Sequence, residues 1–190
     1  MAERPTRVRE LILSDYRAFS GLRGDGPLKR RMLALPRMLL NPSLHAVVLV
    51  RLANGSPRWL HWFWRNVLMW KHSMELVYRS SIGPGLVLPH PIGIVIGRDV
   101  RIGRDARIMH NVVIGPNFLD DRMPVIGDAV ELCTGSMIFG GVAIGDRALI
   151  GAGAFVDFDV PADHVASAPR AKLLPARVTP ARPGAGTAGQ

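Results

Sequence analysis

The sequence predicts a mainly β protein: a parallel β-helix with an α-helical N-terminal region. An aliphatic residue recurs at every sixth position over most of residues 82–160, and glycine often follows it directly. A second column of small or apolar residues lies four positions after the first. A period of six fits neither an α-helix, which repeats about every 3.6 residues, nor a simple hairpin sheet. It indicates short parallel strands stacked in coils. The alternative is a β-sandwich with coincidental spacing.

We call the first column the rungs. Its members are Ile82, Leu88, Ile96, Ile102, Ile108, Ile114, Ile126, Leu132, Ile138, Ile144, Ile150 and Val156. The second column contains Ile92, Val100, Ala106, Val112, Val130, Ser136, Val142, Ala148, Ala154 and Val160. No single coil can bury its own apolar face, so we expect both columns to point into an interior shared by stacked coils.

The chain divides into three parts by composition. Residues 1–79 read as helical, residues 80–173 as the solenoid, and residues 174–190, rich in Pro, Ala and Gly, as a disordered tail. Apolar spacing predicts helices over 5–20, 28–40 and 44–53. Ser43 is available to cap the third, which should stop at Asn54-Gly55.

Residues 59–77 interleave tryptophans with basic residues. A peripheral membrane contact would use such a mixture. We favour a helix that caps the open end of the solenoid, with the tryptophans covering its first coil or a subunit contact.

Composition excludes several classes of protein. The net charge is +9, which suits an anionic small molecule or surface, but the arginines form no nucleic-acid-binding motif. The single Cys133 allows no internal disulfide, which favours the cytoplasm, and its register suggests a small core residue. Residues 1–10 are charged and suggest no signal peptide, and no apolar run is long enough to span a bilayer.

Two histidines interrupt the repeat: His90, in LPHPIGIVIG, and His110, in MHNVVIG. A solenoid binds ligands with its flanks and edges, so polar residues at such interruptions are candidates for function. An isolated histidine of this kind is more often structural than catalytic, and the surrounding sequence has to decide.

Residues 75–115, and in particular His90-Pro-Ile-Gly-Ile-Val-Ile-Gly, resemble the serine acetyltransferase branch of the hexapeptide-repeat acyltransferases. The upstream SLHAVVLVRLAN segment, with Arg51, resembles the helix before the solenoid in that branch, so the likeness covers about residues 43–172. The resemblance implies a left-handed β-helix. It also implies an O-acetyltransferase that uses acetyl-CoA as co-substrate and forms homotrimers with sites at subunit interfaces.

The resemblance places His90 on the family's general base and Glu75 on the acid that pairs with it. A carboxylate against one imidazole nitrogen would fix the tautomer while the other nitrogen takes a proton from the acceptor hydroxyl. No residue lies in a nucleophile motif, so direct transfer is expected.

The ladder breaks between Ile114 and Ile126, where Asp120 would point inward at a cost of several kcal/mol, so we expect an extruded loop. In the resembling enzymes this loop closes over the acceptor. The expected substrate-binding residues are therefore Asp121 and Arg122, together with His110.

The backbone near Gly135, Gly141, Ala152 and Gly153 is expected to hold the pantetheine arm of coenzyme A, and Arg170 and Lys172 to meet its phosphates. Two residues depart from the family pattern around the acceptor. Met123 stands in place of a histidine, and Pro89 in place of the Asp that meets the ammonium group of serine. A sugar or natural-product hydroxyl is thus an alternative acceptor.

Three other readings remain open. The donor is alternatively a longer acyl-CoA or an acyl carrier protein. The chain is alternatively a non-catalytic scaffold that binds a partner through residues 58–79. A metal-dependent hydratase of this fold class needs three histidine ligands, whereas the solenoid offers only His90 and His110 before His164, so no metal is expected.

Overall fold

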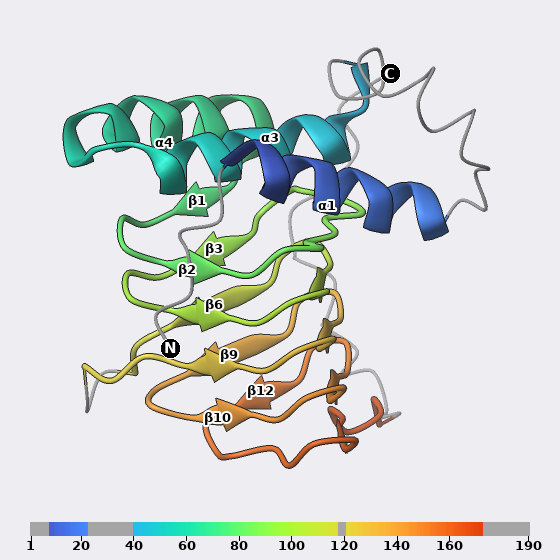
Figure 1. Cartoon of the computed structure of the whole chain (residues 1–190). Coiled ribbons are helices and arrows are strands. Elements are labelled where there is room, and N and C mark those ends of the chain that lie inside the picture. Colours follow the sequence, from blue (N-terminus) through green and yellow to red (C-terminus); the bar gives the residue numbers. More distant parts are fainter. Residues whose placement is uncertain (1–7, 23–39, 118–120, 173–190) are drawn as a thin grey trace, which may run out of the picture.

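The computed structural model describes residues 8–22, 40–117 and 121–172. They form the helices α1 (Val8–Leu22), α3 (Pro42–Gly55) and α4 (Arg58–His72), followed by a stack of very short strands. Figure 1 shows the strands stacked in successive coils, with α3 and α4 lying across one end of the stack. The predicted solenoid with helices before it is confirmed.

Every strand pair is parallel, and the strands form three flat sheets. The first sheet contains β1 (Glu75–Leu76), β3 (Val95–Ile96), β6 (Val113–Gly115), β9 (Met137–Phe139) and β12 (Phe155–Val156). The second contains β2 (Ser81–Ile82), β4 (Arg101–Ile102), β7 (Val125–Ile126) and β10 (Ala143–Ile144). The third contains β5 (Arg107–Ile108), β8 (Glu131–Leu132), β11 (Leu149–Ile150) and β13 (Val165–Ala166).

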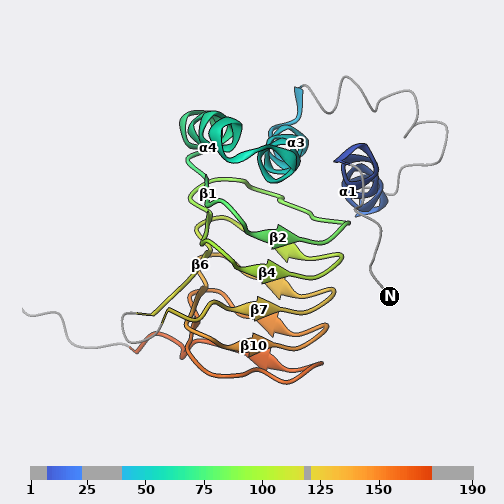
Figure 2. The same cartoon turned by 60° about the vertical axis from the view of Figure 1, so that its left-hand side comes forward.

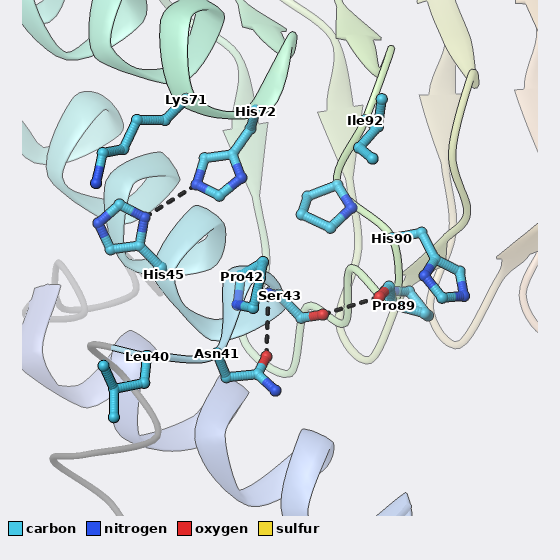
Figure 3. A pocket seen from close by; sticks show the side chains of 11 residues that line it. Leu40, Asn41, Pro42, Ser43, His45, Lys71, His72, Pro89, His90 and Ile92 are labelled. Atoms are coloured by element: carbon cyan, nitrogen blue, oxygen red, sulfur yellow. Dashed lines mark hydrogen bonds between the residues drawn. The ribbon is translucent and has the colours of Figure 1, made fainter.

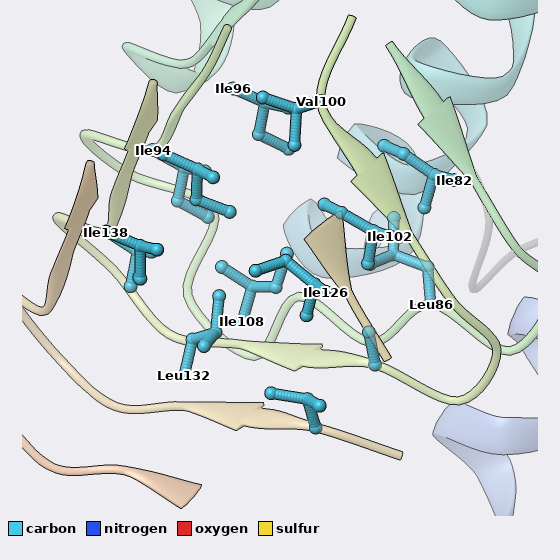
Figure 4. Packing of buried hydrophobic residues seen from close by; sticks show 14 of the residues in the cluster. Ile82, Leu86, Ile94, Ile96, Val100, Ile102, Ile108, Ile126, Leu132 and Ile138 are labelled. Atoms are coloured by element: carbon cyan, nitrogen blue, oxygen red, sulfur yellow. The ribbon is translucent and has the colours of Figure 1, made fainter. Parts of the chain in front are cut away.

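The rungs stack directly on one another. Ile96 pairs in register with Ile114, and Ile114 with Ile138, and all three side chains are completely buried. Figure 4 shows other rungs, such as Ile108 and Ile126, directed into the space between the sheets. One apolar column per sheet therefore builds a continuous core.

One residue of the second column does not point into the interior as the sequence pattern predicts. Ile92 is 59% exposed, and Ile94 fills the interior in its place. The chain between Leu88 and Ile96 is longer than the usual repeat, and Gly93 takes a positive φ of 67°, which shifts the phase of the pattern. The expectation that Ile92 points inward is therefore wrong.

The break between Ile114 and Ile126 is confirmed. Ile126 stacks on Ile102, and residues 116, 117 and 121–124 contribute no strand. Asp120, whose inward position suggested the loop, lies outside the described residues.

The helices agree with the sequence except at their ends. Helix α3 is capped by Asn41, whose Oδ1 accepts from the N–H groups of Ser43 and Leu44, so Ser43 is not the cap. Residues 28–39 of the expected second helix and residues 174–190 lie outside the described residues. None of the described helices has the length and apolar character needed to cross a bilayer.

Helix α4 covers the open end of the solenoid, but only one of its four tryptophans contributes to the cover. Leu68 is fully buried, His61 is 3% exposed and Trp64 is half-buried against the core, whereas Trp59, Trp62 and Trp70 are 75%, 65% and 89% exposed. The expectation that the tryptophans cover the first coil is therefore wrong for these last three.

Cys133 also differs from expectation. It is half-buried beside the rung Leu132 rather than part of the core, and burial raises the pKa of its thiol. Side chains alternate across a strand, so a residue that directly follows a rung points away from the interior.

A buried ion pair joins the helices to the first coil. Arg51 of α3 makes a two-point contact with Asp15 of α1, at 2.7 and 2.9 Å, and both side chains are 1% exposed. The guanidinium also donates to the carbonyl oxygens of Ile82 and Gly83, each at 2.6 Å, while Asp15 accepts from the N–H of Leu86 at 2.8 Å. Both charges are thereby fully hydrogen-bonded.

We expect Asp15→Ala to lower the free energy of unfolding by about 3–5 kcal/mol, because it leaves the Arg51 charge buried without its partner. Urea denaturation followed by circular dichroism measures this change. Arg79→Ala is the matched control, because the Arg79–Asp99 pair is 65% and 40% exposed and should contribute less than about 1 kcal/mol. Equal losses from the two substitutions would contradict a structural role for the buried pair.

Candidate active site

A cleft of about 650 Å³ opens where the start of α3, the end of α4 and the loop before β3 meet. His90 lies on its rim (Figure 3). The other lining residues are Leu40, Asn41, Pro42, Ser43, His45, Lys71, His72, Pro89, Pro91 and Ile92. The described lining therefore carries imidazole, ammonium, amide and hydroxyl groups and no carboxylate.

The loop that carries His90 is fixed from both sides. Ser43, held at the first turn of α3, donates its hydroxyl to the carbonyl oxygen of Pro89 at 2.8 Å. Pro89 and Pro91 flank His90, and each proline ring restricts its own φ and the conformation of the residue before it. The backbone that presents the imidazole is thus tied to the helical cap.

His45 and His72 form a second feature of the cleft. Nδ1 of His45 lies 2.9 Å from Nε2 of His72, so one ring donates and the other accepts. Burial, followed by the Lys71 ammonium, lowers the pKa of His45. Burial, followed by His45 and Lys71, lowers the pKa of His72. Both rings are therefore neutral near pH 7, and the pair gives the cleft a polar wall with a single cation at Lys71.

The structure brings together the two histidines that interrupt the repeat. The ring of His90 lies edge-to-face with that of His110, with centroids 5.7 Å apart and planes at 78°. The imidazole of His90 is exposed and makes no hydrogen bond or ion pair within the described residues. Nδ1 of His110 is buried without a partner. An exposed imidazole with both nitrogens available suits proton transfer to or from a bound ligand.

Glu75 lies on β1, and its carboxylate pairs with the guanidinium of Arg65 on α4. It does not line the cleft. The structure thus gives Glu75 a partner other than His90, and its role as the orienting acid stays a prediction.

Asp121 and Arg122 line a separate hollow of about 430 Å³, which they share with Arg98, Asp99 and Arg101. Gly141, expected to contact coenzyme A, also lies there: a Cβ on it would come within 2.6 Å of the Cβ of Arg122. Met123 is half-buried against the core. Asp121 and Arg122 were expected to bind the acceptor. Within one chain they therefore lie in a different hollow from His90.

Comparison with known proteins shows which family the chain belongs to. No family model matches the chain. The serine acetyltransferase of Helicobacter pylori is 32% identical over 143 residues, covering 72% of this chain and 84% of that protein. This chain belongs to the serine acetyltransferase family.

Solved structures agree with this membership. Soybean serine acetyltransferase complexed with serine superposes with a TM-score of 0.71 at 27% identity, covering 88% of this chain and 69% of that one. The Neisseria gonorrhoeae serine acetyltransferase has a TM-score of 0.69 at 26% identity, covering 83% of this chain and 61% of that one. The expected left-handed β-helix is confirmed.

Most of the residues expected to bind coenzyme A lie on the later coils of the solenoid. Gly135 donates its N–H to the carbonyl oxygen of His110 at 3.0 Å, and Gly153 donates to that of Thr134 at 2.9 Å. These two amides are used in coil stacking and are not free donors. Ala152, Arg170 and Lys172 are exposed.

The sequence analysis did not identify the cleft wall formed by Ser43, His45, Lys71 and His72. The only signal for it was the Asn-Pro-Ser start of α3, which we interpreted as a cap alone. No group of three or more His, Cys, Asp or Glu side chains in residues 8–22, 40–117 and 121–172 is arranged to hold a metal ion.

Proposed function

We propose that this chain is an acetyl-CoA-dependent O-acetyltransferase that acts on a hydroxyl of a small acceptor, serine or a related compound. The observation that carries the proposal is the exposed imidazole of His90 on the rim of a cleft. The sequence resemblance assigns this residue to the family's general base. Family membership supports the acyl-transfer chemistry, and the serine complex of the soybean enzyme supports a small hydroxyl acceptor.

The proposed reaction is a direct transfer. A nitrogen of His90 takes the proton of the acceptor hydroxyl as its oxygen attacks the thioester carbonyl carbon. The carbon–sulfur bond breaks, the acetyl group stays on the acceptor oxygen, and the thiolate of coenzyme A leaves. The imidazolium of His90 returns the proton to the thiolate, so that the enzyme ends unchanged.

The cleft also favours a second class of acceptor. Pro89 stands where the enzymes that this sequence resembles have an Asp that attracts the ammonium group of serine. None of the described residues that line the cleft carries a carboxylate to replace it. A sugar or natural-product hydroxyl needs no such carboxylate, because the hydroxyl of Ser43 and the imidazoles of His45 and His72 offer neutral hydrogen bonds. The alternative donors are a longer acyl-CoA and an acyl carrier protein, and assays that compare them with acetyl-CoA distinguish the three.

For coenzyme A, we propose that the open turns at Gly135 and Gly153 make room for the pantetheine arm. A Cβ on either glycine would meet nothing within 4 Å. Arg170 and Lys172, exposed beyond the last strand, provide cations suited to the phosphates. A cytoplasmic location stays a prediction.

We further propose a homotrimer. Val125, Phe155 and Phe158 are 47%, 56% and 56% exposed on the flanks of the solenoid, and Phe139 and Phe155 form a ring pair with centroids 5.7 Å apart. Exposed apolar side chains of this size favour contact with another subunit. An assembly of this kind would allow the Arg122 hollow of one chain to meet the His90 cleft of the next.

The function is tested by His90→Ala, which should lower turnover by about two to four orders of magnitude through loss of the general base. Mass spectrometry would follow acetyl-CoA consumption against L-serine, homoserine, amino sugars and other alcohols. His164→Ala, at an exposed histidine on the last coil, is the control and should leave turnover unchanged. Undiminished transfer by the His90 variant would remove this residue from the mechanism.

The role of Glu75 is tested by comparing Glu75→Gln with Arg65→Gln. Both substitutions break the same ion pair, but only the first removes an acid that can orient His90. We expect Glu75→Gln alone to lower kcat about tenfold or more and to alter the pH profile. Equal, small effects of both substitutions on kcat would restrict Glu75 to holding helix α4 in place.

The trimer is tested by native mass spectrometry, which should give three times the 20.7 kDa of the chain. Phe155→Asp should shift the mass towards the single chain, because it places a charge in the proposed contact. Trp70→Asp, at an aromatic residue on the helical cap, is the control and should leave the mass unchanged. A wild-type mass equal to one chain would contradict the assembly.

A further inference from the structure

The outer face of helix α4 exposes five large apolar side chains. Trp59, Trp62, Phe63, Met69 and Trp70 are 75%, 65%, 48%, 42% and 89% exposed. Figures 1 and 2 show α4 lying across the end of the coil stack, as one of the outermost elements there. We call these five side chains the aromatic face.

The opposite face of the same helix is fully engaged. Leu68 and His72 are buried, and Trp64 and Val67 are half-buried against the core. Helix α4 therefore carries large apolar side chains on its exposed face as well as on its buried face, whereas a surface helix normally turns a polar face to solvent.

The charges around the aromatic face have one sign. Helix α4 contains no Asp or Glu, and its basic residues are Arg58, Arg65 and Lys71. Arg65 is paired with Glu75, whereas Arg58 and Lys71 are exposed at the two ends of the helix. Tryptophans flanked by cations match the interface of a bilayer that contains anionic lipids, where indole rings lie at the headgroup level.

The N-terminus of α4 also favours a nearby negative charge, and its sequence destabilises the helix when no such charge is present. Pro57 at the N-cap makes no side-chain hydrogen bond, no acid lies in the first turn, and Arg58 adds positive charge at the positive end of the helix dipole. An anionic surface next to this end would compensate both features.

We propose that the aromatic face docks this protein on the surface of an anionic membrane, with Trp59, Trp62 and Trp70 in the headgroup region and Arg58 beside lipid phosphates. The chain would lie on the bilayer without crossing it. The contact itself needs only one chain, but its affinity for the membrane rests on the proposed trimer. Three solenoids related by a threefold axis along their stacks would present three α4 helices in one plane. Linked contacts of this kind multiply the affinity.

The test is co-sedimentation of the full chain with vesicles of phosphatidylcholine alone or with about one-third phosphatidylglycerol. We expect binding to the anionic vesicles only, weakened severalfold when the salt rises from about 0.1 to 0.5 M. The combined substitution Trp59→Ser, Trp62→Ser and Trp70→Ser should reduce partitioning by about tenfold or more. Because these side chains are exposed, the melting temperature and the acetyl transfer measured without lipid should be unchanged.

Two matched controls separate the terms. Val165→Ser removes an exposed apolar side chain from the last strand of the solenoid and should leave vesicle binding unchanged. Arg58→Gln should weaken binding to anionic vesicles, whereas Arg104→Gln, an equal change of charge at a 68% exposed residue, should not.

Three results would overturn the proposal: no binding to anionic vesicles by the wild type, equal binding by the triple tryptophan variant, or a doubling of the wild-type mass without lipid that the triple variant abolishes. The last would assign the aromatic face to contact between copies of the chain. Loss of vesicle binding with intact acetyl transfer would reject docking alone, whereas absence of acetyl transfer to any acceptor would reject the proposed function alone.

Discussion

The hydrogen bonding of the first coil is the constraint on which the rest of the structure depends. Strands β1 and β2 are the edges of their sheets, so their outer carbonyl groups have no neighbouring strand. An unpaired sheet edge invites association, and unpaired buried carbonyls are costly. Arg51 meets this need at Ile82 and Gly83, and Asp15 holds the guanidinium in position. A fully satisfied pair of this kind ties two helices and the first coil into one unit.

The same anchoring extends to the active site through α3. Arg51 fixes one part of this helix on the coil, and Asn41 caps its first turn. That turn places the hydroxyl of Ser43 on the carbonyl of Pro89, directly before His90. His45, from the same helix, meets His72 at the end of α4. The cleft is therefore a consequence of how the helices cap the solenoid, and the position of His90 is set by the cap as much as by the coils.

The sequence was sufficient to predict the coils and insufficient to predict the partners within the site. A period of six is local, and each rung needs only the rungs above and below it, so Ile96, Ile114 and Ile138 could be placed by counting. Counting in steps of six gives the wrong orientation for Ile92, because extra residues between Leu88 and Ile96 shift the pattern. Partners such as Arg65 for Glu75, or His72 for His45, come from elements whose relative positions depend on tertiary packing, which no local pattern contains.

Trp59, Trp62 and Trp70 of α4 are exposed, contrary to the prediction from the sequence, for a related physical reason. An exposed coil end suggests a need for apolar cover, but it also presents backbone carbonyls that only donors can satisfy. His61 of α4 is buried with its two ring nitrogens 3.1 Å from the carbonyl oxygens of Ala53 and Leu76, so that the ring, which has one N–H in its neutral form, donates to one of these carbonyl groups according to its tautomer. With His61, Trp64, Leu68 and Arg51 closing the end, the rings of Trp59, Trp62 and Trp70 are not required there. Their exposure is then a property that the fold does not explain, which is why it points to a surface beyond the chain.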